Sequence, residues 1–255
     1  MERKWWTLLA VCVATFMLLI DVTIVNVALP DIQEDLNASL SSLQWVVDAY
    51  ALTLASFLLV FGSIGDRLGR RRVFSIGFGL FVFASFLCGL ASDPTILNFA
   101  RGLQGVGAAA MFSTALALIA QEFEGRERGK AIGIWGATVG GAVAVGPLIG
   151  GLLTEGLGWE WIFFVNVPIG IAALFLTEIK VRNVSAPDPE PIDYPGLFTF
   201  TSALFLLIFG LIRGNAEGWG STLIVACLGG AAILLAAFVL LERRSDHPML
   251  DLQLF

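Results

Sequence analysis

The sequence predicts an all-α protein that crosses a membrane several times. Apolar residues make up 57% of its 255 residues and charged residues only 14%, whereas a soluble domain is usually about 45–50% apolar and about 25% charged. The apolar residues also gather in long runs, and a run of about 20 residues is enough for one helical crossing. Short segments rich in glycine, proline or charge separate the runs, so the chain has room for roughly eight crossings.

Four spans are expected in the first half of the chain. The first covers 5–29, because Pro30 and three acidic residues follow it. The second, 43–64, ends at a segment rich in glycine and arginine, and the third, 73–91, begins directly after that segment. The fourth covers 95–120 and is followed by a charged stretch. These bounds predict short connections between neighbouring helices.

Four more spans are expected in the second half. The fifth covers 130–153 and is rich in glycine, and the sixth covers 159–178. A charged, proline-containing linker at 180–193 then precedes a seventh span at 194–212 and an eighth at 219–241. Trp5, Trp159 and Trp219 lie near span ends, where aromatic side chains anchor helices at the membrane interface.

The positive charges predict how these spans are oriented. All of the 15 lysines and arginines except Arg101 and Arg213 lie at the two ends of the chain or in alternate loops. An even number of spans places these segments on one side of the membrane, and loops rich in positive charge stay in the cytoplasm. We therefore expect a multi-pass protein of the cell membrane (inner or plasma membrane) with both termini in the cytoplasm.

Composition also excludes several functions. No basic surface interleaved with aromatic residues lies outside the membrane loops, so nucleic acid is not expected as a partner. Cys12, Cys88 and Cys227 occur singly in apolar runs, and His247 is the only histidine. These residues give no spacing for a metal site, and no nucleophile–base pair or phosphate loop is visible. We expect no metal, no cofactor and no enzymatic activity.

Three ionisable residues within the spans are the main functional candidates, because charge in a membrane is costly and usually faces a cavity. Asp21 lies eight residues from Leu29, or roughly 12 Å along a helix. Arg101 is roughly 9 Å and Asp48 roughly 7–8 Å from the expected outer ends of their spans. Gln104 lies one turn from Arg101 on the same helix face. The three ionisable side chains therefore share the outer half of the bundle.

Opposite charges at similar depth can neutralise each other, which lowers the cost of burial for both. Our hypothesis is that Asp21 and Arg101 form a pair whose protonation is coupled to substrate exchange, because a nearby cation and desolvation act on an acid in opposite directions. The alternatives are a purely structural ion pair or side chains that reach the outer surface. For Asp48, which lies nearest the interface, a structural role and a functional role have equal weight.

The segment between the second and third spans, 62–72, has the sequence GSIGDRLGRRR. It resembles the loop between helices 2 and 3 of the major facilitator superfamily of transporters. In that family the loop helps to latch the two halves of the transporter in one conformation. The resemblance implies a conformational latch in this chain formed by Gly62, Asp66, Arg67, Gly69, Arg70 and Arg71.

Three further segments resemble the same superfamily, and two of them resemble one branch of it. The segment 101–110, RGLQGVGAAA, is similar to the superfamily's helix-4 motif, in which the arginine is linked to proton coupling. The segments 19–30 and 45–50 resemble the first and second helices of the drug:proton antiporter branch with fourteen helices. The resemblance implies a site for protons and substrate that contains Asp21, Asp48, Arg101 and Gln104.

The fifth span carries a motif of a different kind. The segment 142–151, AVAVGPLIGG, resembles the antiporter motif G-x-x-x-G-P-x-x-G-G, with Ala142 in place of the first glycine. Pro147 removes a helix hydrogen bond and favours a bend. The resemblance implies an antiporter hinge at Gly146, Pro147, Gly150 and Gly151. The segment 159–170 is similar to the start of the branch's sixth helix, although Glu160 replaces the usual arginine.

The resemblance also implies a domain arrangement. Residues 1–179 correspond to the six-helix N-terminal transporter bundle, 180–193 to a cytoplasmic linker, and 194–242 to two additional transmembrane helices. Residues 243–255 correspond to a cytoplasmic tail that leads to a C-terminal bundle. Transport by this family needs two bundles that rock against each other. We expect that bundle in the rest of a longer chain; the alternative is a second chain.

The function implied is the N-terminal part of a proton-coupled multidrug antiporter that exports lipophilic, cationic compounds. Its partners are then a small-molecule substrate, protons, the lipid bilayer and the missing bundle. Two alternatives stay open. One is export of a single metabolite or antibiotic, and the other is a membrane scaffold that transports nothing. The charged residues within the spans favour transport, because a scaffold has no need of them.

Overall fold

The computed structural model describes residues 2–183 and 193–244, and within these ranges the secondary structure consists of helices joined by short turns, with no strand. The helices are α1 (Arg3–Asp35), α2 (Leu40–Leu68), α3 (Arg70–Gly89), α4 (Pro94–Glu122), α5 (Gly125–Leu157), α6 (Trp161–Phe164), α7 (Asn166–Lys180), α8 (Tyr194–Glu217) and α9 (Thr222–Glu242). Eight segments are long and apolar enough to cross a membrane, with α6 and α7 together making one of them. The predicted all-α, multi-pass fold is confirmed.

Parts of two expected segments lie outside the described residues. Of the expected linker at 180–193, positions 184–192 are not described. Of the expected tail at 243–255, only positions 243 and 244 are described, and His247 is among the remainder.

The first helix is longer than the sequence predicts. We expected it to end at Pro30, but α1 continues through Pro30 to Asp35. A proline inside a helix removes one hydrogen bond and bends the helix but does not have to end it. Ile32, beyond the proline, is fully buried, so packing against the bundle stabilises the additional turn.

The sixth span is assigned as two helices, α6 and α7, but its backbone stays helical between them. Val165 has φ −61° and ψ −29°, and its N–H donates to the Trp161 carbonyl at 3.0 Å. Pro168 then lies in the first turn of α7, where its missing N–H costs no helix hydrogen bond. The two helices together make one membrane-crossing segment, and Asn166 is the first residue of α7.

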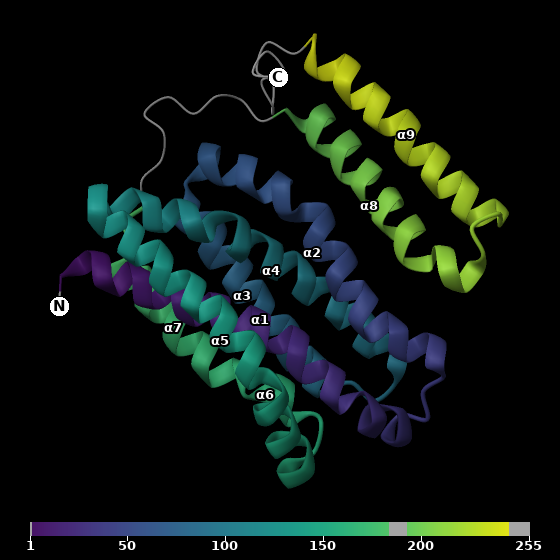
Figure 1. Cartoon of the computed structure of the whole chain (residues 1–255), viewed down its shortest axis with the longest axis horizontal. Helices are drawn as coiled ribbons and strands as arrows, with labels where there is room; N and C mark the ends of the chain where they lie inside the picture. Colours follow the sequence, from purple (N-terminus) through teal and green to yellow (C-terminus); the bar gives the residue numbers. More distant parts are fainter. Residues whose placement is uncertain (1, 184–192, 245–255) are drawn as a thin grey trace.

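Six crossings form one bundle in which α4 packs between α2 and α3, and α5 packs along α1 (Figure 1). Glycines let α4 approach its neighbours closely. A Cβ atom at Gly107 would lie 2.6 Å from the backbone nitrogen of Phe81 on α3. A Cβ atom at Gly105 would overlap the Tyr50 carbonyl and the Thr53 hydroxyl on α2. These crossings fix the depth and rotation of α4, which carries Arg101 and Gln104.

The apolar core of the bundle has two parts. One contains Leu18 and the first half of α1, together with Phe74, Phe78 and Phe81 of α3. The other contains Ile20 and the second half of α1, together with Phe163 of α6. Asp21 follows Ile20 directly, so the charged residue of α1 lies where these two apolar regions meet.

Helices α8 and α9 pack mainly on each other and contact the bundle through α2 (Figure 1). Their contact with α2 includes a small apolar cluster that contains Val60, Leu197, Phe200 and Phe238. The rings of Phe200 and Phe238 lie 4.9 Å apart. Most of α5 remains exposed, since only Ala131, Ala142, Gly146 and Gly150 are buried on it.

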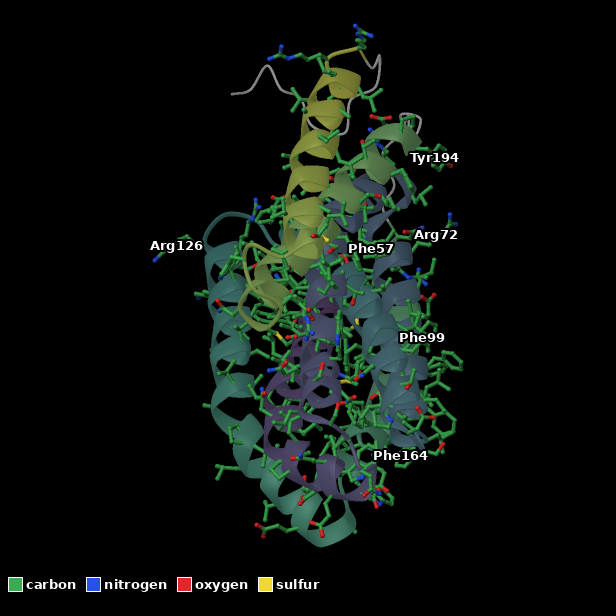
Figure 2. The ribbon with its side chains drawn as sticks, turned by 90° about the vertical axis from the view of Figure 1, so that its right-hand side faces the viewer. Phe57, Arg72, Phe99, Arg126, Phe164 and Tyr194 are labelled. Atoms are coloured by element: carbon green, nitrogen blue, oxygen red, sulfur yellow. The ribbon has the colours of Figure 1, made fainter. Side chains whose placement is uncertain are left out.

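Charged and aromatic side chains occur together at one end of the bundle, where Phe57 lies at the level of Arg72 (Figure 2). Arg72 and Arg126, from two of the positively charged loops, lie toward one end, and Phe164 lies toward the other (Figure 2). Phe99 is 73% exposed and points away from the helices (Figure 2). Such exposed rings are compatible with a lipid environment rather than with water.

Candidate functional site

Arg101 is completely enclosed by the bundle. Its side chain is only 1% exposed, and it is among the largest fully buried side chains of the described residues. The α4 helix that carries it begins at Asp93, whose carboxylate accepts hydrogen bonds from the Thr95 and Ile96 backbone N–H groups. Pro94 occupies the first turn, which proline favours. The residue at which α4 begins determines which face of the helix each later residue occupies, and Arg101 falls on the face that points into the bundle.

The guanidinium of Arg101 has four partners. Its Nη1 atom donates to Asp21 Oδ2 at 2.5 Å and to Gln104 Oε1 at 2.7 Å. Its Nε atom donates to the Val46 backbone carbonyl at 2.9 Å. The Tyr50 ring lies 4.4 Å below the guanidinium carbon, a favourable cation–π distance. Three of these four contacts do not involve Asp21.

The carboxylate of Asp21 is equally buried, at 1% exposure. Its Oδ2 atom pairs with Arg101, and its Oδ1 atom accepts hydrogen bonds from Gln104 Nε2 at 2.9 Å and from Asn166 Nδ2 at 3.4 Å. A buried ion pair is tolerated only where further hydrogen bonds satisfy the remaining polar atoms. The amides of Gln104 and Asn166 meet that condition.

A further shell of polar side chains orients these amides. Ser85 Oγ accepts from Asn166 Nδ2 at 3.1 Å and from Gln104 Nε2 at 3.4 Å, and it donates to the Phe163 carbonyl at 3.0 Å. The Tyr50 hydroxyl donates to the Leu18 carbonyl at 3.1 Å. Side chains from α1, α2, α3, α4 and α7 therefore meet in one network, which we call the Asp21 cluster: Asp21, Tyr50, Ser85, Arg101, Gln104 and Asn166.

The structure brings Asp21, Arg101 and Gln104 together but leaves Asp48 outside the Asp21 cluster. Within the described residues, no hydrogen bond or ion pair joins Asp48 to these three. The expected depth of Asp48 did not decide which way it faces. Val46 and Tyr50 contact Arg101, whereas Asp48 lies one turn from Trp45 on the α2 face that meets α8.

Arg213 of α8 is the cationic side chain on the side of α2 that carries Trp45 and Asp48. The sequence predicts Arg213 near the outer end of the seventh span, but the structure places it within α8 at 8% exposure. It forms an ion pair with Glu217 at 2.6 Å and lies 5.4 Å from the Trp45 ring. The chain thus holds a second, separate group of charges between α2 and α8.

The expected latch residues lie at the end of α2, at the start of α3 and, for Gly69, in the tight turn between them. Gly69 has a φ of 100°, which favours glycine. Asp66 accepts hydrogen bonds from Arg70 at 2.8 Å, and Arg71 forms an ion pair with Glu178 of α7. Gly62 faces Ser113 of α4, and Arg67 lies half-buried beside the turn. Their role as a latch stays a prediction.

The expected hinge residues divide into two groups. Gly146 and Gly150 pack against α1, where a Cβ atom at Gly146 would overlap Thr23 and one at Gly150 would lie 3.3 Å from Ile24. A Cβ atom at Gly151 would have nothing within 4 Å. Pro147 lies inside α5, which remains one helix. Their role as a hinge also stays a prediction.

Sequence reasoning missed three members of the Asp21 cluster, Ser85, Asn166 and Tyr50. Each is a single polar residue in an apolar run, a pattern that rarely identifies a site by itself. For Asn166 one signal was available, because the residue is followed closely by Pro168, which favours a local break in the helix. The groups of acidic and sulfur side chains in the described residues offer no metal site.

Comparisons with known proteins identify the family of this chain. The family model described as Major Facilitator Superfamily matches residues 11–248. A puromycin resistance protein of Streptomyces alboniger is 43% identical over 97% of this chain and 49% of its own length. The multidrug resistance protein Stp of Mycobacterium tuberculosis is 43% identical over 98% of this chain and 47% of its own length. The chain thus spans about half the length of these curated relatives.

A solved structure shows the same arrangement of helices. The POT family transporter PepTSo has a TM-score of 0.67 to this chain, at 18% identity, over 96% of this chain and 55% of its own. An identity this low supports the fold alone.

Proposed function

Because the chain belongs to the major facilitator superfamily, we propose that it is the N-terminal part of a proton-coupled efflux transporter for lipophilic, cationic compounds. The superfamily consists of transporters rather than enzymes. The observation that carries the proposal is the Asp21 cluster, an acid and a base fully buried together in the middle of a membrane bundle. Intramembrane charges of this kind usually serve transport.

The geometry supports two protonation states of Asp21. When Asp21 is ionised, its two oxygens accept from Arg101, Gln104 and Asn166. When Asp21 takes up a proton, Arg101 loses its counter-ion but keeps the Val46 carbonyl, the Gln104 oxygen and the Tyr50 ring. Neither state leaves the guanidinium without partners. A cationic substrate near Asp21 would favour its ionised form, so substrate and proton would compete.

Transport also needs a second bundle, since alternating access rocks one bundle against another. The exposed surface of α5 supports this part of the proposal. A Cβ atom at Gly129, Gly133, Gly136 or Gly140 would meet nothing within 4 Å, so this face is free for close contact with another helix. We propose that the rest of a longer chain supplies that bundle; a second chain is the alternative.

We further propose the domain arrangement expected from the sequence, with a six-helix bundle at 1–179, a linker at 180–193 and two additional helices at 194–242. The packing of α8 and α9 mainly on each other supports it. The proposed location is the cell membrane with both ends of this chain in the cytoplasm, which the distribution of lysine and arginine supports.

Efflux from cells tests the proposal. Cells that express the gene encoding this chain should export ethidium, and a proton uncoupler should abolish the export. Asp21→Asn should abolish proton-driven export, because the variant cannot exchange a proton at that position. Export is compared per amount of folded protein in the membrane, because the substitution also removes the counter-ion of Arg101. Asp48→Asn is the matched control and should retain most of the export, because Asp48 lies outside the Asp21 cluster. Full export by Asp21→Asn would disprove the proposed proton coupling.

The second candidate function is export of a narrower range of substrates. It is favoured by the first relative described above, which is named for resistance to a single antibiotic, puromycin. A resistance panel separates the two functions. A multidrug exporter should raise tolerance to several unrelated lipophilic cations, whereas a specific exporter should protect against one compound. A membrane scaffold should change tolerance to none of them.

A further inference from the structure

Helix α8 carries a buried cation whose hydrogen-bonding groups are only partly satisfied. Arg213 is 8% exposed, and its Nη2 atom forms an ion pair with Glu217 at 2.6 Å. Its Nη1 atom is enclosed by protein and finds no acceptor among the described residues. A buried N–H group without an acceptor costs free energy, and the cost is greater where the donor is charged. A conformation that supplies an acceptor to Nη1 would remove this cost.

The neighbouring face of α2 carries an acid that lacks a donor. Asp48 is half-buried, and it makes no hydrogen bond or ion pair within the described residues. It lies one turn from Trp45, whose ring is 5.4 Å from the Arg213 guanidinium carbon, so Asp48 is on the side of α2 that faces Arg213. A guanidinium has five N–H donors in a planar fork. Arg213 can therefore hold Glu217 and Asp48 at the same time.

The interface between α2 and the two additional helices is apolar at one end and charged at the other. Toward the expected cytoplasmic side, Val60 of α2 packs in one apolar cluster with Phe238 of α9 and with side chains of α8. The contact between Trp45 and Arg213 lies about 22 Å away along α2, at a rise of 1.5 Å per residue. Apolar packing therefore holds the cytoplasmic end of the interface, whereas the outer end contains a charge that is not fully paired.

The middle of this interface is loosely packed. An apolar cavity of about 670 Å³ lies between α2 and α8, with Phe57 on the α2 side and Phe198 and Phe205 on the α8 side. Protein interiors are normally packed as densely as organic crystals, with few voids larger than a water molecule. The cavity therefore leaves space for α8 to shift against α2.

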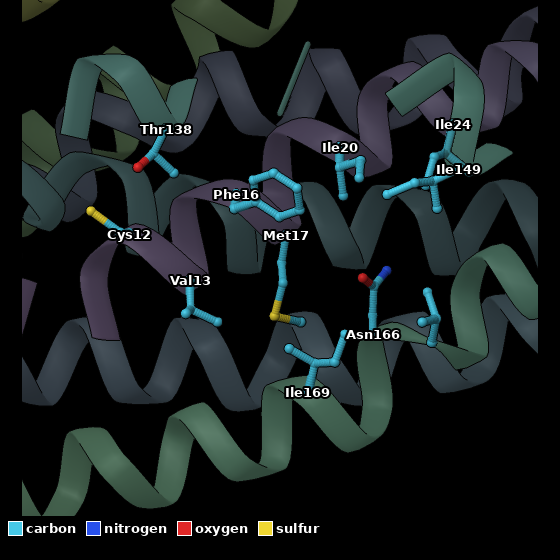
Figure 3. Close-up of a pocket in the computed structure, with 11 residues that line it drawn as sticks. Cys12, Val13, Phe16, Met17, Ile20, Ile24, Thr138, Ile149, Asn166 and Ile169 are labelled. Carbon is cyan, nitrogen blue, oxygen red and sulfur yellow. The ribbon is translucent and has the colours of Figure 1, made fainter. Parts of the chain in front are cut away.

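Loose packing also occurs beside the Asp21 cluster. An apolar cavity of about 440 Å³ lies between α1, α5 and α7, with Asn166 in its wall (Figure 3). The charges next to that cavity are satisfied, because Asp21 and Arg101 bind each other and Gln104. The interface between α2 and α8 differs, because there the loose packing occurs together with an acid and a base that lack partners.

We propose that Asp48 and Arg213 form a second ion pair in another conformation of this chain, in which the outer end of the α8–α9 hairpin moves toward α2. The apolar cluster that contains Val60 is the pivot of this movement, and Glu217 holds Arg213 while the pair is open. Helices α8 and α9 pack mainly on each other, so they move as one unit. The inference goes beyond the proposed efflux function, because it requires neither a particular substrate nor proton exchange at Asp21.

Distances between two spin labels test the proposal. The labels are attached at Ser41→Cys, near the start of α2, and at Gly220→Cys, in the turn between α8 and α9; both positions are exposed. The three natural cysteines are replaced by alanine, and double electron–electron resonance is recorded in phosphatidylcholine nanodiscs. The labelled chain with Asp48 and Arg213 intact should show two distances, a longer one for the open pair and a shorter one for the closed pair.

Two acid-to-amide substitutions should act in opposite directions. Asp48→Asn removes the acceptor of the closed pair and should lower the ratio of the shorter to the longer distance about fivefold. Glu217→Gln removes the counter-ion of the open conformation and should raise the ratio. Arg213→Gln should lower it, and adding Asp48→Asn should cause no further loss, because both substitutions break one contact. Asp31→Asn, at an exposed position of α1, is the control for loss of an acid and should leave the ratio unchanged.

Several results would overturn the inference. A single distance, or a ratio that falls equally in Asp48→Asn and Glu217→Gln, would show that no exchangeable pair exists. Additive losses in the double variant would show that the two residues act separately. If Arg213→Gln does not fold, the two acid-to-amide variants decide alone. Ethidium efflux separates the two proposals: efflux with a single distance overturns this contact alone, whereas two distances that respond as expected, without efflux, overturn the transport role and keep the contact.

Discussion

Asp21 is an acid at a position where the membrane gives it no water, so its charge depends on the side chains around it. Removing one partner of a buried ion pair usually costs about 3–5 kcal/mol, because the other charge stays buried without compensation. Replacing both charges is often far less costly. The difference between these two cases provides a test of the Asp21–Arg101 pair that does not depend on transport.

We expect Asp21→Asn to lower the free energy of unfolding by about 3–5 kcal/mol, because Arg101 then remains charged without its counter-ion. Arg101→Gln should lower it similarly. The double variant Asp21→Asn with Arg101→Gln should recover most of the loss, since two neutral amides can hydrogen-bond to each other. Tryptophan fluorescence during denaturant unfolding in detergent measures all four proteins. Strictly additive effects of the two substitutions would contradict a coupled pair.

The double variant also strengthens the efflux experiment. If it folds as well as the unchanged protein yet exports no ethidium, the loss of export follows from the loss of the Asp21–Arg101 pair rather than from misfolding. Asp48→Asn again serves as the control for a general loss of negative charge.

At the scale of single residues, the sequence predicts how deep a side chain lies in the membrane better than it predicts which neighbouring helix the side chain faces. Counting residues along each span predicts that Asp21 and Arg101 lie at similar depth, and the structure joins them. The same count puts Asp48 at a similar depth, but Asp48 lies on a different face of α2. That face is directed toward Arg213 of α8, with no ion pair between the two side chains in the described residues. Asn166 and Ser85 could not be predicted, because their importance arises only when α3 and α7 meet.

At the scale of helices, α5 combines two kinds of glycine within one motif. Gly146 is buried against Thr23 of α1, whereas Gly151 faces open space. Sequence spacing identifies both as parts of a small-residue pattern but does not tell which of them contacts another helix. The same limit applies to Pro30, where the packing of Ile32 keeps α1 helical beyond the proline.

We therefore expect opposite effects from the same substitution at two positions of α5. In Gly146→Ala the new methyl group would lie 2.7 Å from Thr23 Cβ, and such overpacking usually costs about 1–3 kcal/mol. Gly151→Ala adds a methyl group in open space and should stabilise the helix by about 0.5–1 kcal/mol. Thermal unfolding in detergent, followed by circular dichroism, measures both. Equal unfolding temperatures would show that α1 and α5 do not pack as described.

At the scale of the whole molecule, composition and the distribution of charge predict the fold class and the number of crossings. The expected spans correspond to the eight membrane-crossing segments of the structure, because hydrophobic length is a direct physical requirement of the bilayer. The contact of α8 and α9 with α2 was not predicted. It depends on a few apolar side chains, such as Phe200 and Phe238, that have no distinctive spacing in the sequence.

The orientation of the bundle gives the last prediction. Alkaline phosphatase is active only outside the cytoplasm of a bacterial host, because its disulfides form there. Fused after Gly218, in the turn between α8 and α9, it should be active; fused after Phe123, between α4 and α5, it should be inactive. Green fluorescent protein at the same positions should give the reverse pattern. The expected orientation follows from the arginines around 67–72 and 126–130, which favour the cytoplasmic side. Strong phosphatase activity of the fusion after Phe123 would therefore show that the bundle has the opposite orientation. The Asp21 cluster would then lie nearer the cytoplasm than the outer surface.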